Sequence, residues 1–246
     1  MKLAFLGTVH DPEGKNINLF MECNKYLNEI YDYIFLTISD KTSKEYIKLI
    51  KEANYNIKII AKKGAANARR EVVKFGVNNE EVDYYHYCDF DRVLVWIKNN
   101  LDELRSLKRY ITDCEFLIIG RTEKAFLSHP IAWRETERLT NKVFSEYVGR
   151  SVDITGGSCA FSKKVAKLIH KYSKEKVTDG EWPIIAYKFN MKLDYIEVNG
   201  LEYLEDNNRA NINLSTAEVL IVRIGLCNKI AQSIKDTWDL MWIGLK

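Results

Sequence analysis

The hydrophobic positions of this chain fall into two alternating patterns. Short apolar runs typical of buried strands are separated by stretches in which apolar residues recur every three or four positions, as on one face of a helix. The pattern predicts strands over 2–6, 33–38 and 56–61 and a fourth that ends at Asp89, with helices over 18–30 and 44–53 and a third that ends near Phe75. Strands and helices that alternate in this way predict a parallel α/β sheet.

Beyond Asp91 the alternation is less regular. We expect helices over 93–107, 130–147 and 163–172, a helix that starts near Val177, and strands over 116–120, 152–161 and 192–198. Residues 121–129 are predicted to form a polar loop, and Asp179 is a suitable N-cap for the helix near it. A long helix follows from Ser215, so we expect a domain over 1–210 and a C-terminal helical extension over 211–246.

Composition argues against several classes of protein. The formal charge is only +3 and no Lys/Arg cluster dominates a segment, which disfavours a nucleic-acid partner. The five cysteines include no Cys-x-x-Cys pair, a distribution that fits reduced thiols better than a disulfide framework or a zinc site. No apolar run reaches the roughly 18 residues of a membrane span, and the first apolar run is too short for a signal peptide. We therefore expect a cytoplasmic protein.

The most informative segment is Asp89-Phe90-Asp91, at the end of the fourth predicted strand. In an extended chain residues i and i+2 face the same side, so both carboxylates are expected to point one way, with Phe90 in the core. Two carboxylate ligands suit Mg²⁺ or Mn²⁺ bound together with phosphates. A solvated strand end is the plain alternative. Residues 89–93 also fit the opening motif of haloacid-dehalogenase-like phosphatases, in which Asp89 would be the nucleophile.

Other polar residues follow the ends of the predicted parallel strands. His10, Asp40, Lys63 and Asp89 each lie just beyond one of the first four strands. Ligands of parallel α/β sheets bind at the carboxyl ends of the strands. The sequence therefore predicts the functional site at this edge of the sheet.

Four segments, in this order and at this spacing, resemble GT-A glycosyltransferases, most closely the inverting family-two group. The resemblance covers about residues 2–200. Residues 39–43 (SDKTS) resemble the loop that contacts the base and ribose of the nucleotide, and residues 63–70 (KGAANARR) are similar to the helix start after the third strand. Residues 89–91 (DFD) occupy the position of the metal-binding Asp-x-Asp motif, and residues 178–182 (TDGEW) resemble the late acidic motif that supplies the catalytic base.

The departures from the family pattern are also clear. The first strand ends in GTVH (7–10) where relatives often carry Pro-x-Tyr-Asn, and Arg70 replaces the usual Asn. The late motif reads Asp-x-Glu rather than Glu-Asp, which leaves the base open between Asp179 and Glu181. Retaining relatives often use a late His as a metal ligand. His170 lies within a predicted helix, so inversion is favoured.

The resemblance implies a mostly parallel, Rossmann-like nucleotide-diphospho-sugar transferase sheet, with a nucleotide-binding half over 1–92 and an acceptor half over 93–210. It implies a UDP- or GDP-sugar donor and Mg²⁺ or Mn²⁺ on Asp89 and Asp91. The expected donor-binding residues are Thr8, His10, Asp40, Lys63, Gly64, Arg69, Arg70, Asp89 and Gly157. For Arg69 and Arg70 a solvated helix face is an equal alternative.

The acceptor side is less defined. Arg121, His129, Arg134 and Trp182 are the expected acceptor-binding residues, and the arginines would suit an anionic acceptor such as a lipid phosphate, although a small molecule or a glycan is also possible. Helix salt bridges and packing of Trp182 are the structural alternatives.

A sugar-phosphate nucleotidyltransferase is the main rival function, but it would need a Gly-rich phosphate loop, which residues 8–14 do not supply. The apolar C-terminal helix predicts either a homodimer contact or a peripheral membrane contact.

Overall fold

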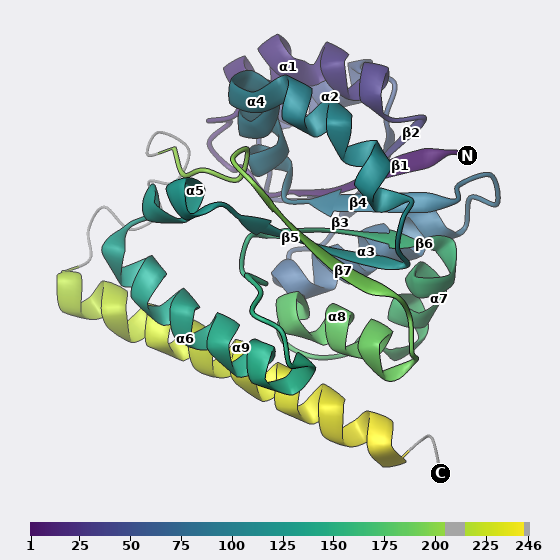
Figure 1. The fold of residues 1–246 in the computed structure, drawn as a ribbon. Helices are drawn as coiled ribbons and strands as arrows, with labels where there is room; N and C mark the ends of the chain where they lie inside the picture. The colour runs from purple at the N-terminus through teal and green to yellow at the C-terminus, as the bar shows by residue number, and fades with distance from the viewer. Residues whose placement is uncertain (205–214, 244–246) are drawn as a thin grey trace.

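The chain folds around a seven-stranded sheet, seen in a computed structural model that describes residues 1–204 and 215–243, with the side chains of the last helix described as far as Leu240 (Figure 1). β6 is antiparallel to both of its neighbours, and the other described strands run parallel to one another. The predicted mostly parallel α/β sheet is confirmed. The strand order is β3 (Asn56–Ile60), β2 (Tyr33–Ser39), β1 (Leu3–Val9), β4 (Tyr84–Cys88), β6 (Ser158–Ser162), β5 (Phe116–Arg121), β7 (Leu193–Val198).

Central strands read as continuous apolar runs because helices cover both faces of the sheet. Along β1, Phe5 packs into the core on one face and Leu6 into the core on the other. The edge strand β3 is instead largely exposed. The hydrophobic pattern of each strand therefore follows its position in the sheet.

The helices cover both faces of the sheet (Figure 1). One core layer holds α1 (Ile17–Ile30), α2 (Lys44–Glu52) and α4 (Phe90–Ile111). The opposite layer holds α3 (Ala65–Val77), α7 (Lys163–Tyr172) and α8 (Thr178–Lys188), with the long helices α6 (Ile131–Val148) and α9 (Thr216–Ile243) packed outside. A short helix, α5 (Glu123–Leu127), lies between β5 and α6.

The structure brings the carboxyl ends of the parallel strands and the start of β6 to one edge. Because β6 is antiparallel, its first residue, Ser158, lies beside Cys88 at the end of β4. The turn before β6 contains Gly157 at φ +73°, a conformation that glycine adopts at little cost. This turn thus reaches the edge where the site was predicted.

Four local predictions are wrong. Strand β4 ends at Cys88 and helix α4 begins at Phe90, so Asp91 lies in the first turn of a helix and not in an extended chain. The predicted strand over 152–161 forms only over Ser158–Ser162, and the predicted loop over 121–129 contains α5. The N-cap of α8 is Val177, with Asp179 inside the first turn. The local sequence is compatible with a helix that begins a few residues earlier or later, and tertiary contacts determine which of these starting positions is used.

The C-terminal helix α9 packs along α6 and α8. The Trp238 ring contacts Tyr147 and stacks on Tyr187, so this tryptophan is part of the domain packing. The predicted domain boundary at 210 and the side chain of Trp242 lie outside the described residues.

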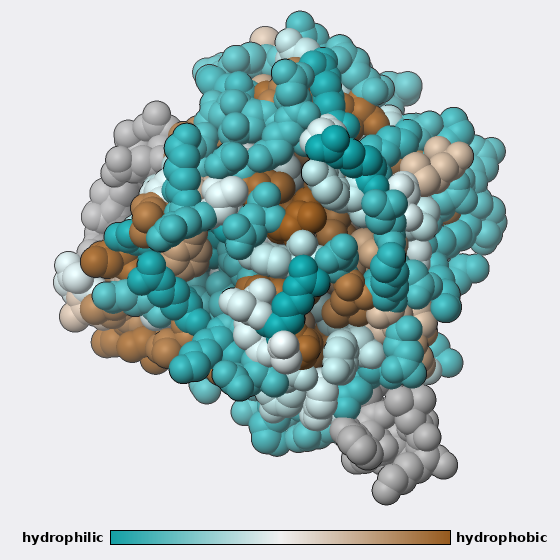
Figure 2. Space-filling view, in the orientation of Figure 1, coloured by the Kyte–Doolittle hydropathy of each residue, from teal (hydrophilic) through white to brown (hydrophobic). Residues whose placement is uncertain are grey.

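Hydrophobic side chains are exposed where α6 and α9 begin, at the lower left of Figure 2. They are Ile131, Leu139, Ile221, Val222 and Ile224. The predicted dimer or membrane contact of this surface stays a prediction. Within the described residues, no helix has the length and apolar character needed to cross a membrane.

Candidate functional site

A cavity of about 440 Å³ opens at the carboxyl edge of the sheet, between the ends of β1 and β4, the loop before α1 and the starts of α2, α3 and α4. Five of the predicted donor- or metal-binding residues line it: Thr8, His10, Arg69, Asp89 and Asp91. Burial and the nearby Lys62 lower the pKa of His10, which favours the neutral imidazole. The strand topology therefore gathers side chains that the sequence places more than eighty residues apart.

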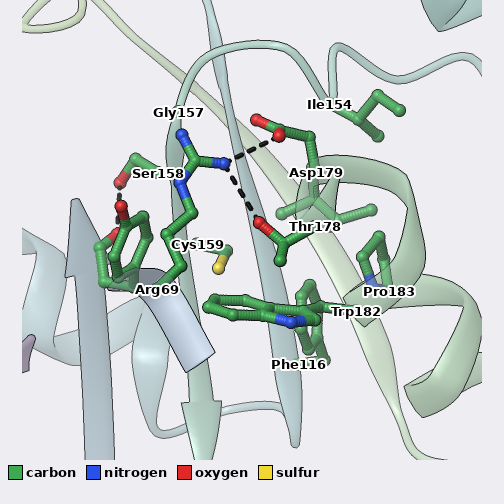
Figure 3. Close-up of a pocket in the computed structure, with 12 residues that line it drawn as sticks. Arg69, Phe116, Ile154, Gly157, Ser158, Cys159, Thr178, Asp179, Trp182 and Pro183 are labelled. Carbon is green, nitrogen blue, oxygen red and sulfur yellow. Dashed lines mark hydrogen bonds and ion pairs between the residues drawn. The ribbon is translucent and has the colours of Figure 1, made fainter. Parts of the chain in front are cut away.

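Arg69 is the central residue of this edge. Its guanidinium donates to both oxygens of Asp89 at 3.1 and 3.0 Å. It also donates to Asp179 at 2.7 Å and to the Thr178 hydroxyl at 3.1 Å, as the dashed lines in Figure 3 show. One arginine from α3 thus joins the end of β4 to the start of α8. The solvated-face alternative for Arg69 is wrong, since only 12% of its side chain is exposed.

Asp89 is held by several groups besides Arg69. The Tyr87 hydroxyl donates to it at 2.5 Å, and Arg92 lies 3.9 Å from it. Burial alone would raise the pKa of Asp89, but Arg69 and Arg92 outweigh burial and lower the pKa. A Cβ on Gly157 would lie 3.1 Å from the Asp89 carboxylate, so the glycine turn closes over it. Asp89 is therefore a fixed, ionised carboxylate.

Asp91 is in a different environment from Asp89. Among the described residues its carboxylate has no ion pair and no side-chain hydrogen bond. Burial, and next the negative charge of Asp89, raise the pKa of Asp91. The Asp91 carboxylate is only partly buried, and a bound cation would stabilise its charged form.

The side chains at this edge fit a divalent metal that is bound partly by its substrate. Asp89, Asp91 and Asp179 carry three negative charges against the two positive charges of Arg69 and Arg92, which leaves a net negative site. Within the described residues no group of three or more His, Cys, Asp or Glu side chains could hold a metal alone. The arrangement suits Mg²⁺ or Mn²⁺ held by one or two carboxylates plus phosphate oxygens.

A second, smaller cavity lies on the other side of Arg69 (Figure 3). Asp179, Gly157 and Trp182 line it together with Arg69 and Ser158. The Trp182 side chain is only 2% exposed, so the packing alternative holds and stacking on a sugar ring is not available to it. Its ring lies edge-on to Tyr87 and Phe161, and its Nε1–H donates to Ser173 at 3.0 Å.

The two candidate bases lie in different places. Asp179 faces the small cavity, next to Arg69. Glu181 is 1% exposed and accepts hydrogen bonds from the Ser173 hydroxyl at 2.5 Å and from the backbone N–H groups of Lys174 and Glu175 at 2.5 and 2.8 Å. Its carboxylate thus fixes the loop before α8, and it has no access to an acceptor. The geometry of the helix therefore distinguishes Asp179 from Glu181, whereas the sequence motif alone did not.

Several predicted donor-binding residues do not line the larger cavity. Arg70 turns away from it and donates to the Glu175 carbonyl oxygen at 2.7 Å. Asp40 accepts from the backbone N–H of Lys62 at 3.1 Å, next to the exposed residues Lys63 and Gly64. Gly64, at φ +90°, is the N-cap of α3. Asp40 and Gly64 thus shape the loop that leads into α3, whereas Arg70 holds the segment before α8.

Arg121 belongs to a buried charge network and is not an acceptor ligand. It pairs with Asp153 at 2.8 Å and with Glu137 at 2.8 Å, and Glu137 also pairs with Arg223 of α9. The Arg121 side chain is fully buried. Burial alone would raise the pKa of Asp153, but Arg121 lowers it to about 2. The network stabilises the junction of β5, α6 and α9.

The remaining acceptor candidates lie nearer the site. His129 lines a narrow pocket with Asp91, Arg92 and Tyr203, and its Nε2 lies 3.1 Å from the Leu201 carbonyl oxygen. Burial, and next Arg121, lower the pKa of His129 to about 3. Arg134 is half-buried and lines none of these cavities. Of the predicted set, His129 alone borders a metal-ligand candidate.

Several residues of the larger cavity and its walls were not among the predicted site residues. Tyr87, read only as part of a strand, connects Thr8 at 3.3 Å to Asp89. Asn16 and Tyr46 also line the larger cavity. The position of Asn16 just before a predicted helix was a usable signal, whereas nothing in the helical pattern of α2 distinguishes Tyr46.

Comparison with known proteins gives a structural likeness. No protein-family model matches the sequence, and no curated protein matches it either. The fold matches glucosyl-3-phosphoglycerate synthase from Mycobacterium tuberculosis in complex with Mn²⁺, UDP-glucose and phosphoglyceric acid, with a TM-score of 0.53, 9% identity, and coverage of 91% of this chain and 80% of that one. A UDP complex of that enzyme matches with a TM-score of 0.50 and 12% identity, and the match covers 91% of this chain and 80% of that one. A mycobacterial protein matches with a TM-score of 0.53 and 10% identity, and the match covers 91% of this chain and 73% of that one.

This chain has the GT-A fold of nucleotide-sugar transferases. At these identities the likeness concerns the fold alone. The fold class predicted from the sequence is confirmed, and the cavities that hold Arg69, Asp89 and Asp179 lie at the edge where such sheets bind ligands.

Proposed function

We propose that this chain is a glycosyltransferase that moves a sugar from a nucleotide-diphosphate donor to an acceptor hydroxyl, with Mg²⁺ or Mn²⁺ as cofactor. The observation that carries the proposal is the bridge of Arg69 between Asp89 and Asp179. It places a cationic group, a metal-ligand candidate and a base candidate in contact, and these are the groups that sugar transfer needs.

Asp89 and Asp91 are the residues that would hold the metal. When bound, the metal supplies positive charge that stabilises the leaving diphosphate. Structures of glucosyl-3-phosphoglycerate synthase with Mn²⁺ and with Mg²⁺ support a divalent cofactor for a protein of this fold.

Arg69 has the donors to bind a phosphate. Its Nε–H is buried and has no hydrogen-bond partner among the described residues, although its terminal nitrogens are paired. Guanidinium groups bind phosphate oxygens through several N–H donors at once. A donor diphosphate in the larger cavity therefore competes with Asp179 for the Arg69 guanidinium, and this competition frees the Asp179 carboxylate.

Asp179 is the proposed general base. It lies at the smaller cavity beside Gly157, where its carboxylate accepts the proton of the acceptor hydroxyl as the new glycosidic bond forms. Glu181 is excluded from this role by its three hydrogen bonds to the loop before α8. A single base on this side of the donor fits inversion of configuration.

The acceptor is proposed to be a small molecule that presents its hydroxyl to Asp179 at the smaller cavity. The phosphoglyceric acid bound by the synthase of the same fold supports an anionic acceptor. Glycans and lipid phosphates remain acceptors to be screened.

Two rival functions fit the contacts less well. A haloacid-dehalogenase-like phosphatase would need Asp89 as a nucleophile together with a late Gly-Asp-x-x-x-Asp acid cluster, and the sequence contains no such cluster. A nucleotidyltransferase would need a Gly-rich loop after β1, and residues 8–14 contain a single glycine.

The test is release of nucleoside diphosphate from UDP-glucose, UDP-N-acetylglucosamine and GDP-mannose, each with Mn²⁺ or with EDTA. We expect Mn²⁺-dependent release with one donor, and its loss in Asp91→Asn and Asp179→Asn. Release of pyrophosphate from a nucleoside triphosphate and a sugar phosphate would instead identify a nucleotidyltransferase. Unchanged turnover in Asp179→Asn would contradict the assignment of the base.

A further inference from the structure

One surface of the molecule exposes only basic side chains. Over residues 163–176, which form α7 and the loop after it, every exposed side chain is a lysine or a histidine. We call this surface the basic face, and it consists of Lys164, Lys167, His170, Lys171, Lys174 and Lys176. Residues 163–176 contain six lysines and one glutamate, a formal charge of +5, whereas the whole chain carries +3. The small net charge conceals a strong local one, which corrects the expectation that no lysine cluster dominates a segment.

The helical spacing places these cations on one side of α7. Val165, Ala166 and Ile169 lie on the opposite side and are buried in the core layer beneath. Ser162 fixes the start of the helix, because its hydroxyl accepts from the Val165 N–H at 3.3 Å. The apolar side of α7 is therefore occupied by packing within the domain, and the side that remains offers charge alone.

Few charges of the basic face are neutralised within the protein. Lys164 lies 3.3 Å from Glu115, and the other five side chains have no ion pair among the described residues. Glu175, the one acid in the segment, is half-buried. Two further carboxylates near the face are already paired with other lysines, Glu80 with Lys163 and Glu71 with Lys58.

This arrangement does not serve the stability of the helix. Like charges three or four positions apart on a helix repel one another, and Lys164, Lys167 and Lys171 have this spacing. A partner that supplies negative charge would relieve the repulsion. The basic face therefore points to an anionic partner.

The shape of the basic face favours an extended partner over a small anion. Its side chains are exposed, and α7 alone is ten residues long, or about 15 Å at roughly 1.5 Å per residue. Clusters of about four to eight lysines on one side of a helix are typical of proteins that bind anionic lipid surfaces. Recognition of nucleic acids instead relies on arginine forks and stacked aromatic rings, and the exposed side chains here include neither. Tyr172 packs on Phe189, with ring centroids 5.0 Å apart.

The basic face leads to the candidate site. β6 begins at the site and ends at Ser162, and α7 then returns toward the edge from which β6 started. Lys174 and Lys176 lie on the loop that enters α8, and Asp179 follows in the first turn of that helix. The Glu181 carboxylate fixes this loop by accepting from the Lys174 N–H. A surface bound by the basic face is therefore close to the smaller cavity.

We propose that the basic face binds an anionic lipid bilayer by electrostatic attraction, without inserting into it. Because α7 has no free apolar side, binding depends on the lysines alone and must weaken steeply as salt is added. The apolar side chains at the starts of α6 and α9 lie on the opposite side of the molecule from α7 in Figure 1, so they form a separate surface. Together with the proposed function, this placement favours a lipid phosphate among the acceptors.

The experiment is co-sedimentation of the full chain with vesicles of phosphatidylcholine alone and of phosphatidylcholine with about one-third phosphatidylglycerol, in low and in high salt. The variant is Lys167→Glu/Lys171→Glu/Lys174→Glu. The matched control is Lys44→Glu/Lys48→Glu/Lys51→Glu, which reverses three exposed lysines of α2 with the same spacing and the same change in net charge. On α2 the exposed acids Glu45 and Glu52 lie among the lysines, so that surface is of mixed charge.

We expect wild type to sediment with the anionic vesicles in low salt, and neither with phosphatidylcholine alone nor in high salt. Each lysine strengthens binding to an anionic surface by up to about fivefold, so the basic-face variant should bind at least about tenfold more weakly. The control should stay within about threefold of wild type. All three proteins should melt at similar temperatures, since every substituted side chain is exposed.

Three results would overturn the assignment. Wild type that ignores anionic vesicles in low salt has no lipid-binding face, and equal binding to both kinds of vesicle would point to an apolar contact. Equal losses in the variant and the control would mean that net charge alone matters. Tighter binding to a DNA duplex than to the anionic vesicles at the same salt would assign the face to nucleic acid. Vesicle binding lost only in the basic-face variant, in a protein that turns over no nucleotide sugar, would support the lipid surface and contradict the proposed function alone.

Discussion

Removing the Arg69 guanidinium is the sharpest perturbation of the site. In Arg69→Met, Asp89 and Asp179 lose the cation they share while remaining largely buried, with 24% and 15% of their side chains exposed. Breaking a buried ion pair by removing one partner costs about 3–5 kcal/mol, and the partial exposure of these carboxylates reduces this to about 2–4 kcal/mol. For a domain of this size that corresponds to a fall in melting temperature of roughly 5–12 °C.

The pH dependence of this loss gives a second readout. Arg69 and Arg92 outweigh burial and lower the folded-state pKa of Asp89, so its contribution to stability is present above the unfolded value of about 3.9 and is lost as the pH falls through the folded pKa. The cost of Arg69→Met, measured by urea unfolding, should therefore be largest near pH 7 and shrink below about pH 4. Neutralising one carboxylate in Arg69→Met/Asp179→Asn should recover at least about 1 kcal/mol.

The control is Arg105→Met, which removes an exposed arginine that also pairs with two carboxylates, Glu29 and Asp102. Exposed pairs contribute about 0–1 kcal/mol, so this variant should change stability little. A cost for Arg69→Met no larger than that of the control, or one that is the same at pH 3 and pH 7, would refute the reasoning.

Three further predictions test neighbouring contacts. Gly157→Ala should lower the melting temperature more than Gly149→Ala, because both glycines have φ near +70° but only the first Cβ would approach Asp89; similar losses would mean that backbone strain alone matters. Asp153→Asn should cost about 3–5 kcal/mol at pH 7 and flatten the loss of stability between pH 4 and pH 2, since the folded pKa of Asp153 is about 2; an unchanged acid unfolding profile would contradict the Arg121 network. Glu181→Gln should lower stability yet leave nucleotide binding intact, whereas Asp179→Asn should abolish turnover and keep the fold; the reverse pattern in activity and melting assays would exchange the two roles.

Much of the fold follows from local sequence. The apolar run of β1 and the helical spacing of α1 are properties of consecutive residues, and parallel topology then brings Thr8, Arg69 and Asp89 to one edge. Those parts of the site were predictable because the strand ends alone fix them.

Contacts between distant segments were not predictable in the same way. Arg69 and Asp179 are 110 positions apart, and nothing near either residue indicates the other. Glu181 has the chemistry of a base, but its burial depends on the path of the loop over 173–175. Arg121 has the chemistry of an anion-binding residue. It is paired inside the protein only because α6 and α9 bring Glu137 and Arg223 next to it. Side-chain chemistry gives the candidates, and tertiary packing decides which of them face a ligand.

The measurement that tests the central claim most directly is the thermal stability of the wild-type chain with UDP and with GDP, each in Mn²⁺ or in EDTA, beside Asp91→Asn. A ligand that binds only the folded state raises its melting temperature. The account predicts a rise with one of the two nucleotides that requires Mn²⁺ and is lost in Asp91→Asn. A rise of equal size in EDTA or in Asp91→Asn would contradict the metal site, and no rise with either nucleotide would contradict the donor site itself.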